Sequence, residues 1–144
     1  PLQEATPGQA VTVLLADDLS ITRGDMICRP NNRPRVSQEL EAMLCWMDDA
    51  APMQPGKIYT IKHTTKVART KITEVLYRLN ISTLSRETGV NQLAMNEIGR
   101  VTLHTTAPLM FDDYHQNRTT GCFIIVDEAT GQTAGAGMLL SPRT

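Results

Sequence analysis

Three histidines and a short acidic cluster are the side chains that could do acid–base or metal chemistry. His63, His104 and His115 are far apart in the sequence, and a metal site needs two or three ligands that converge. Asp112 and Asp113 could form an acid–base cluster with His115 in principle, but no Ser or Cys nucleophile stands beside them. Aspartates at turns more commonly cap backbone amides. We predict structural turn residues here and no catalytic or metal-binding residue; a hydrolase using Asp112 and His115 is the weaker alternative.

Nucleotide binding has no motif in this chain. Pro55-Gly56-Lys57 contains a Gly-Lys pair, but Ile58 follows where a phosphate-binding loop needs Ser or Thr. Gly131, Gly135 and Gly137 do not have the spacing of a dinucleotide-binding fingerprint. Glycines inside a strand commonly allow another group to approach the backbone closely. We therefore expect no cofactor-binding residue in this chain.

Composition argues against two classes of partner. The chain has 144 residues, of which 41% are hydrophobic and 20% charged, as in ordinary globular domains. Its formal net charge of −1 gives no general attraction to nucleic acid or to an anionic membrane. No apolar run approaches the roughly 18 residues of a membrane-spanning helix. We expect a cytoplasmic protein with no nucleic-acid and no membrane partner.

The cysteines do not indicate a disulfide framework. Cys28, Cys45 and Cys122 are an odd number at wide spacing, with no CxxC pair. All three lie in apolar, strand-like contexts, where free cysteines are commonly buried. We predict three buried thiols.

Alternation of apolar and polar residues predicts an all-β chain. After residue 34 the predicted strands cover residues 39–46, 58–63, 67–79, 99–106, 122–126 and 132–140. A phase change near Thr73 and Glu74 indicates a β-bulge, and residues 84–96 read as a long loop with one helical turn. The run 122–126 is apolar on both faces, as in a strand covered on both sides. Residues 36–141 are thus predicted to form an antiparallel six-stranded β-barrel.

The first thirty residues are predicted to belong to another barrel. Residues 10–15 and 24–28 have strand patterns, but an isolated two-stranded hairpin is marginal in water. We assign residues 1–30 to the last strands of a truncated preceding barrel and residues 31–35, rich in Pro and Asn, to a linker. The orphan strands would give an isolated fragment a tendency to self-associate.

Two surface features have more than one interpretation. The segment 62–71 carries five basic side chains: Lys62, His63, Lys66, Arg69 and Lys71. It could contact RNA phosphates or an acidic protein partner, or it is a solvated hairpin. Trp46 lies on the alternating apolar face, where it is either a core residue or an anchor at an interface.

Several runs resemble the GTP-binding large subunits of bacterial sulfate adenylyltransferase, a branch of the translation-factor-type GTPases. RGDMI at 23–27 and GAG at 135–137 are shared with elongation factors generally. NEIGR at 96–100 and D-x-Y-x-x-N-R-x-T-G at 112–121 are more specific to the sulfate-activating branch. The resemblance covers about residues 7–140; Asp113 departs from it, because Pro is common at that position.

The resemblance implies an architecture: the end of domain II and all of domain III of an elongation factor Tu-like protein. It also implies a parent protein that couples GTP hydrolysis to synthesis of adenosine 5′-phosphosulfate and pyrophosphate from ATP and sulfate. GTP and Mg²⁺ would bind in an N-terminal domain without matching residues here, and adenylyl transfer would occur on a separate small subunit. Some members of the branch are fused to an adenylylsulfate kinase.

The implied partners of this chain are the small catalytic subunit and the parent's own GTPase domain. The candidate contact residues are polar or aromatic and come from two loops: Lys62, Lys66, Asp112, Tyr114, Asn117 and Arg118. The alternative function is a tRNA- or partner-binding barrel of an elongation factor-type GTPase.

Overall fold

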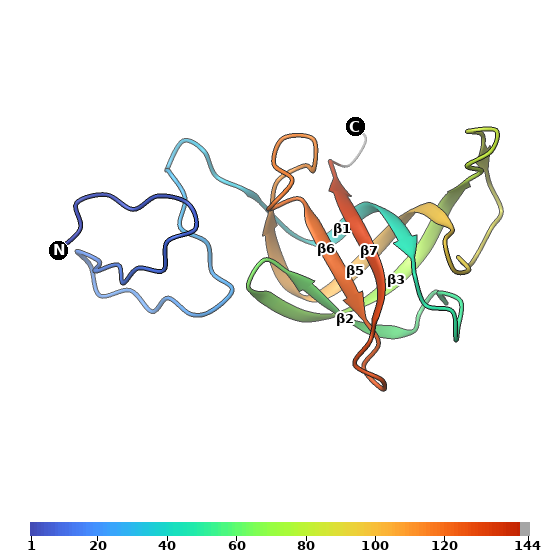
Figure 1. Cartoon of the computed structure of the whole chain (residues 1–144), viewed down its shortest axis with the longest axis horizontal. Coiled ribbons are helices and arrows are strands. Elements are labelled where there is room, and N and C mark those ends of the chain that lie inside the picture. Colours follow the sequence, from blue (N-terminus) through green and yellow to red (C-terminus); the bar gives the residue numbers. More distant parts are fainter. Residues whose placement is uncertain (142–144) are drawn as a thin grey trace.

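The regular structure of this chain lies entirely after residue 34 and consists of strands (Figure 1). The structure is a computed structural model that describes residues 1–141. The strands are β1 (Arg35–Trp46), β2 (Ile58–His63), β3 (Lys66–Leu79), β4 (Arg86–Glu87), β5 (Ile98–Phe111), β6 (Cys122–Val126) and β7 (Thr133–Leu140). Within residues 1–141 there is no helix that could span a membrane.

The six longer strands close into an antiparallel barrel. The strand order is β2-β6-β7-β1-β5-β3-β4, and β2 also pairs with β3. This last pairing joins the two sides of the sheet, so that none of the six long strands is left as a free edge. The predicted six-stranded barrel is confirmed; β4, only two residues long, extends the sheet beside the end of β3.

The predicted strand boundaries agree with the structure to different degrees. Strands β2 and β6 have the predicted limits, and a register shift between Ile72 and Glu74 confirms the bulge in β3. Strand β5 continues to Phe111, five residues beyond the predicted 106, because its end pairs with the start of β1. The helical turn predicted within 84–96 is wrong, since that segment holds β4 and turns.

The hydrophobic core fills the inside of the barrel and is formed by the inward-facing side chains of the strands. Trp46 is buried there and meets Tyr59 edge to face, with ring centroids 5.4 Å apart. Its indole Nε1 donates a hydrogen bond of 2.8 Å to the Ala51 carbonyl, so the core interpretation of Trp46 is confirmed. A Cβ at Gly137 would lie 2.2 Å from the Phe123 ring, which confirms that this glycine permits close packing.

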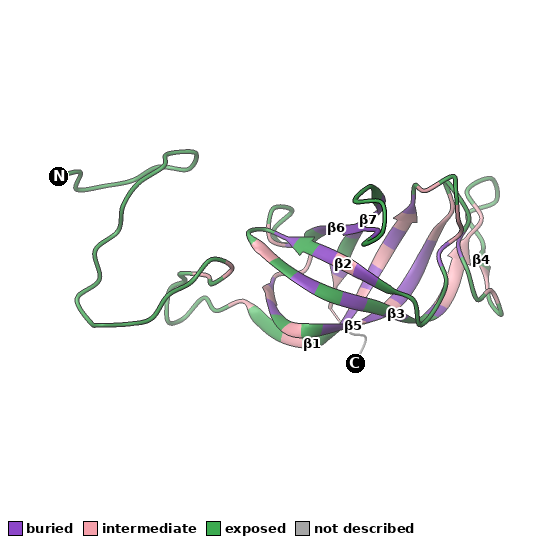
Figure 2. Cartoon of the chain, turned by 90° about the horizontal axis from the view of Figure 1, so that it is seen from below, coloured by how far each residue is buried: buried purple, intermediate pink, exposed green. Residues whose placement is uncertain are grey.

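Residues 1–34 form no strand and are almost entirely exposed (Figure 2). The strands predicted at 10–15 and 24–28 are therefore not formed in this chain. The physical reason is that the apolar side chains of Val11, Val13 and Leu15 stay exposed and do not join the core, and no strand within residues 1–141 pairs with this segment. Assignment of residues 1–30 to a preceding barrel, and of 31–35 to a linker, stays a prediction.

The prediction of three buried thiols is wrong. Cys28 and Cys122 are exposed, and Cys45 is partly buried. Cys28 lies in the exposed N-terminal segment, while Cys45 and Cys122 lie between inward-facing neighbours and project outward from their strands. A strand-like context does not decide burial, because alternate side chains point to opposite faces.

Candidate partner interface

The structure brings the two loops of the candidate interface together at one end of the barrel. The β2–β3 hairpin carries Lys62 and Lys66, and the turn between β5 and β6 carries the other candidates. A hydrogen bond of 2.6 Å between His63 Nε2 and the Thr120 carbonyl joins hairpin and turn. The candidates therefore share one end of the barrel, although about fifty residues of sequence separate the loops.

Two of the six candidate residues stabilise the turn between β5 and β6. Asp112 accepts a hydrogen bond of 2.7 Å from the Thr120 hydroxyl. The Asn117 side-chain oxygen accepts hydrogen bonds from the backbone N–H groups of Thr119 and Thr120, at 3.0 and 3.3 Å. These contacts are those of turn residues, as the sequence indicated for the acidic cluster.

Asp113, which departs from the family pattern, has a structural role. Partial burial opposes its ionisation, but the Ser141 and His115 N–H groups donate hydrogen bonds of 2.8 and 2.9 Å and hold the pKa of Asp113 below its ordinary value. The carboxylate is therefore ionised near neutral pH, and it ties the end of β7 to the turn. A group held ionised in this way is unsuited to act as a general acid.

The remaining candidates face two different directions. Lys66 lies against the N-terminal segment, where a Cβ at Gly24 would stand 2.6 Å from Lys66 Cδ. Asp112 and Asn117 border a hollow of about 280 Å³ whose other side is formed by residues of the same segment. Lys62 and Tyr114 border a separate groove on the outer wall of the barrel. Arg118 is exposed, with its guanidinium 6.0 Å from the centroid of the Tyr114 ring.

The basic segment 62–71 is partly neutralised within the chain. Arg69 forms a two-pronged ion pair with Glu128, at 2.8 and 2.9 Å, and this pairing holds the pKa of Glu128 below its ordinary value. Thr70 points inward and donates to the His104 carbonyl at 3.0 Å. Lys62 and Lys71 are exposed, so the positive charge left for a partner is small.

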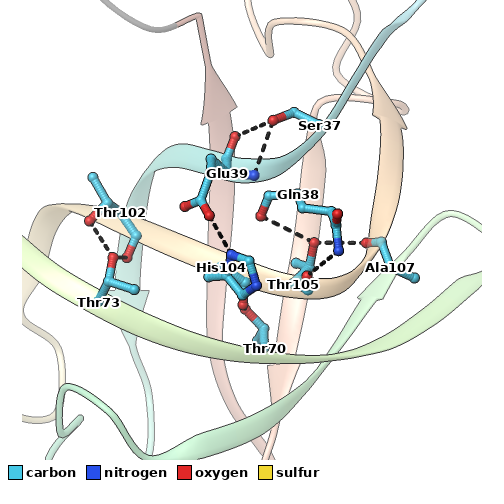
Figure 3. A network of polar contacts seen from close by, with 9 residues as sticks. All are labelled: Ser37, Gln38, Glu39, Thr70, Thr73, Thr102, His104, Thr105 and Ala107. Atoms are coloured by element: carbon cyan, nitrogen blue, oxygen red, sulfur yellow. Dashed lines mark hydrogen bonds and ion pairs between the residues drawn. The ribbon is translucent and has the colours of Figure 1, made fainter.

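The three histidines occupy separate environments. His63 is buried at the hairpin, and His115 is exposed in the turn. His104 lies on the outer wall beside Glu39, within a polar network that joins β1, β3 and β5 (Figure 3). In residues 1–141 there is no group of three His, Cys, Asp or Glu side chains that could hold a metal ion.

The network of Figure 3 lies where the pairing of β1 with β5 changes register. The Ser37 hydroxyl donates to the Glu39 carbonyl at 2.7 Å and accepts from the Glu39 N–H at 3.0 Å. The Gln38 side chain donates to the Thr105 carbonyl at 3.0 Å. These bonds satisfy backbone groups at an interrupted ladder, so the network maintains the barrel wall and offers no catalytic arrangement.

Sequence reasoning missed an apolar groove of about 570 Å³ on the outer wall over β6, β7 and β1. Its lining includes Met43, Met138 and Ile124, all of which point away from the core. The signal that could have found it is the run 122–126, which is apolar on both faces. That pattern correctly showed a strand with two apolar sides, but not where the second side would lie.

The fold defines a small closed β-barrel domain, and the described residues give it no catalytic constellation. A family model described as "GTP-eEF1A C-terminal domain-like" matches residues 39–140. The chain therefore belongs to the GTP-eEF1A C-terminal domain-like family. A solved structure of Sup35 complexed with GDP has the same fold, with a TM-score of 0.70 at 15% identity over 80% of this chain and 28% of that chain.

Relatives with much higher identity confirm the resemblance to the sulfate-activating branch. The chain is 49% identical over 140 residues to the "Bifunctional enzyme CysN/CysC" of Mycobacterium tuberculosis. This match covers 97% of this chain and 23% of the relative. It is 40% identical over 139 residues to the "Sulfate adenylyltransferase subunit 1" of Bacteroides fragilis, covering 96% of this chain and 29% of the relative. The chain thus spans less than a third of the length of these curated relatives.

Proposed function

We propose that this chain is the C-terminal, non-catalytic β-barrel of the GTP-binding subunit of a sulfate adenylyltransferase. The observation that carries the proposal is identity of 40–49% over nearly the whole chain to proteins named for this enzyme or for CysN/CysC. The family-model match to residues 39–140 agrees with the barrel's position in such a subunit. The side chains on the inner face of the barrel are buried in the core. The barrel therefore acts through its outer surface.

The parent protein, on this proposal, couples GTP hydrolysis to formation of adenosine 5′-phosphosulfate and pyrophosphate from ATP and sulfate. GTP and Mg²⁺ bind to a domain outside this chain, and the adenylyl transfer takes place on the small subunit. Residues 1–30 are the end of a second barrel that precedes this one. The barrel's own contribution is mechanical, because a rigid closed sheet can carry a displacement from one contact surface to another.

The experiment is a coupled assay on the parent protein. The parent subunit and its small subunit are co-expressed, and pyrophosphate release from ATP and sulfate is followed with and without GTP. GTP-stimulated, sulfate-dependent release is the expected result. Purified parent and small subunit that release pyrophosphate at the same rate with and without sulfate would contradict the proposal.

The alternative is a tRNA-binding barrel of an elongation factor-type GTPase, and the exposed Lys62 and Lys71 are what favour it. Binding through phosphates weakens steeply as salt is raised, so tRNA titrations at low and moderate salt separate the two proposals. We expect no salt-sensitive complex, because the net charge is −1 and Arg69 is already paired with Glu128.

A further inference from the structure

The β3–β4 connection forms an arm that projects from one end of the barrel (Figure 1). Strand β4 is the last in the strand order and pairs with the end of β3, and residues 80–85 form the turn at the tip. Strand β3 begins at the β2–β3 hairpin and ends in the arm. The arm, residues 78–87, and the hairpin therefore lie at opposite ends of the barrel.

The tip of the arm exposes two large aliphatic side chains. Leu84 is 75% exposed and Ile81 is 66% exposed, the two highest values among the large hydrophobic residues of the barrel. Neither belongs to the hydrophobic core. Leu84 also has a φ of 57°, in the left-handed region that glycine and asparagine adopt far more readily than leucine. Strained conformations of this kind concentrate at binding and switch regions, so the exposed Leu84 side chain points to a contact with another surface.

Hydrogen bonds hold the tip in one conformation. The Asn80 side-chain oxygen accepts from the N–H groups of Ser82 and Thr83, at 3.0 and 3.1 Å. The Leu84 N–H donates to the Asn80 carbonyl at 2.7 Å, and the Thr83 and Ser85 hydroxyls bond at 2.8 Å. An ordered turn thus carries the two aliphatic side chains, which lowers the entropy lost when they are bound.

An ionic network fixes the arm to the barrel and leaves one positive charge beside the tip. The Arg78 guanidinium pairs with Glu87 of β4 and with Glu97, each at 2.8 Å. Arg86, the other residue of β4, is exposed, with its guanidinium 4.9 Å from the centroid of the Tyr77 ring. Both carboxylates are engaged by Arg78, so the cation of Arg86 is the charge that the arm presents to a partner.

Two methionines lie at the same end of the barrel as the arm. The Asn96 N–H donates to the Trp46 carbonyl at 2.8 Å, and this contact brings the neighbouring residues Met95 and Met47 to the end of the barrel where the arm begins. They are 49% and 45% exposed. Methionine is enriched at protein interfaces and adapts its shape to a partner. These two residues, with Ile81 and Leu84, are named the arm end.

Neighbouring domains of a longer polypeptide attach at the opposite end of the barrel. The chain enters beside the hairpin, where Gly24 lies against Lys66, and leaves beside the β5–β6 turn, where the Ser141 N–H donates to Asp113 at 2.8 Å. The arm end lies away from both connections (Figure 1). A surface in this position is best placed to meet a separate protein chain.

A second copy of this chain is a poor partner for the arm. Arg86 and Glu87 are adjacent in β4 and point to opposite faces, and residues paired directly across strands share a face. Two-fold antiparallel pairing of β4 with its copy would therefore set Arg86 opposite Arg86 or Glu87 opposite Glu87, and like charges in that position repel. Contact between two tips would bury only the aliphatic side chains of each, well short of the roughly 800 Å² per partner of a stable interface.

We propose that the arm end inserts into an apolar recess of the small subunit, with Ile81 and Leu84 as the anchoring side chains and an acidic group of the recess beside Arg86. Aliphatic anchors contribute binding free energy when they leave water and fill a pocket, and complementary charge at the rim sets the orientation. The inference rests on the proposed function, which supplies the separate subunit. It gives that subunit a contact independent of the candidate residues at the hairpin end.

Leu84→Asn in the full-length parent separates the role of the side chain from that of the turn, because asparagine accepts the left-handed conformation. We expect the Kd for the small subunit, measured by calorimetry, to rise about tenfold and to rise further when Ile81→Ser is added. The matched control is Ile58→Thr, at an exposed aliphatic residue outside the arm end and the hairpin. It should leave the Kd within about twofold.

The same substitution in the 144-residue chain shows whether Leu84 serves only its own turn. We expect Leu84→Asn to leave the urea midpoint of unfolding unchanged or to raise it, because the strain at this position is relieved. A lowered midpoint would overturn the proposal, since the Leu84 side chain would then be needed for the fold.

Thiol labelling identifies what covers the arm end. Ser82→Cys, at the exposed tip, is treated with N-ethylmaleimide in the 144-residue chain, in the parent alone and in the parent with its small subunit. Peptide mass spectrometry reads the rate at that position, and we expect it to fall at least about tenfold only when the small subunit is present in excess over its Kd. Protection in the parent alone at any concentration would assign the arm end to another domain, and protection that rises with the parent's concentration would assign it to a second copy. Either result would overturn the proposal.

The affinity measurement also separates this inference from the proposed function. An unchanged Kd in the parent with both arm substitutions would overturn the inference, and GTP-stimulated, sulfate-dependent release of pyrophosphate by that parent would leave the proposed function standing. A parent that binds the small subunit through the arm end but shows no sulfate-dependent release would defeat the proposed function and leave this inference standing.

Discussion

Gly137 in β7 lies where the barrel has no room for a larger side chain. A Cβ there would meet the buried Phe123 ring at 2.2 Å. Because Phe123 would have to leave its position, we expect Gly137→Ala to lower the free energy of unfolding by about 1–3 kcal/mol. Urea denaturation followed by Trp46 fluorescence measures the change. The neighbouring Ala136→Ser, on the outer face, should stay within about 0.5 kcal/mol; equal effects of the two changes would contradict the packing argument.

Asp127 gives the barrel a pH-dependent contribution to stability. The Lys57 ammonium, 2.9 Å away, and the N–H groups of Thr130 and Ala129 hold the pKa of Asp127 below its ordinary value of 3.8. A carboxyl whose folded-state pKa is depressed stabilises the fold above its unfolded pKa, and this stabilisation is lost as pH falls through the folded value.

We therefore expect Asp127→Asn to destabilise the barrel near neutral pH and to have little effect once the carboxyl is protonated in both states. Chemical denaturation of both proteins at about pH 7 and about pH 2.5 checks the difference. Asp49→Asn, at an exposed carboxylate, controls for the change in net charge. A destabilisation by Asp127→Asn that is as large in acid as at neutral pH would refute an ionic contribution.

The closed barrel and the N-terminal segment differ in the strand pairing and burial that stabilise them. Each of the six long strands pairs with two other long strands, whereas residues 1–34 are almost entirely exposed, including Val13, Leu14 and Ile27. The barrel should therefore fold without the segment, and the segment should be the part that causes association.

Deletion of residues 1–33 tests both expectations. We expect the shortened chain to unfold in one transition, with a free energy of unfolding within about 2 kcal/mol of the longer chain. Size-exclusion chromatography over a range of concentrations should show less association than for the longer chain. A variant of the 144-residue chain, with Val13, Leu14 and Ile27 changed to Ser, controls for chain length. Association that persists in both the shortened chain and the serine variant would show that the associating surface lies on the barrel.

The β2–β3 hairpin end of the barrel remains a candidate surface for the small subunit. Of its lysines, Lys62 is exposed and Lys66 is partly covered by the N-terminal segment. We predict that reversing both charges to Glu in the parent weakens small-subunit binding roughly tenfold, or about 1.4 kcal/mol. Calorimetry measures the affinity, and Lys71→Glu, at an exposed lysine outside the candidate set, is the control. Unchanged affinity in the double variant would remove this hairpin from the interface.

The sequence was sufficient for those parts of the fold that depend on local pattern. The local pattern placed β2 and β6 at their limits, β6 as a run that is apolar on both faces, and the loss of phase near Thr73 located the bulge. Pattern failed where pairing overrides it: the strand predicted at 99–106 continues to Phe111, because Leu109 and Phe111 pair with the start of β1. It failed again at residues 10–15, whose alternation is clear but which pair with no strand within residues 1–141.

The candidate partner interface, like the fold, was predictable from the sequence only in part. The family, the barrel and the inward-facing residues could be predicted from the residues alone, because residue order and side-chain period are local properties of the chain. The folded structure was needed to show that Lys62 and Tyr114 border one groove, that Asp112 bonds to Thr120 within its turn, and that Cys122 faces outward. Periodicity states which residues share a face; what that face meets depends on strands and domains far away in sequence, and these are brought together only by folding.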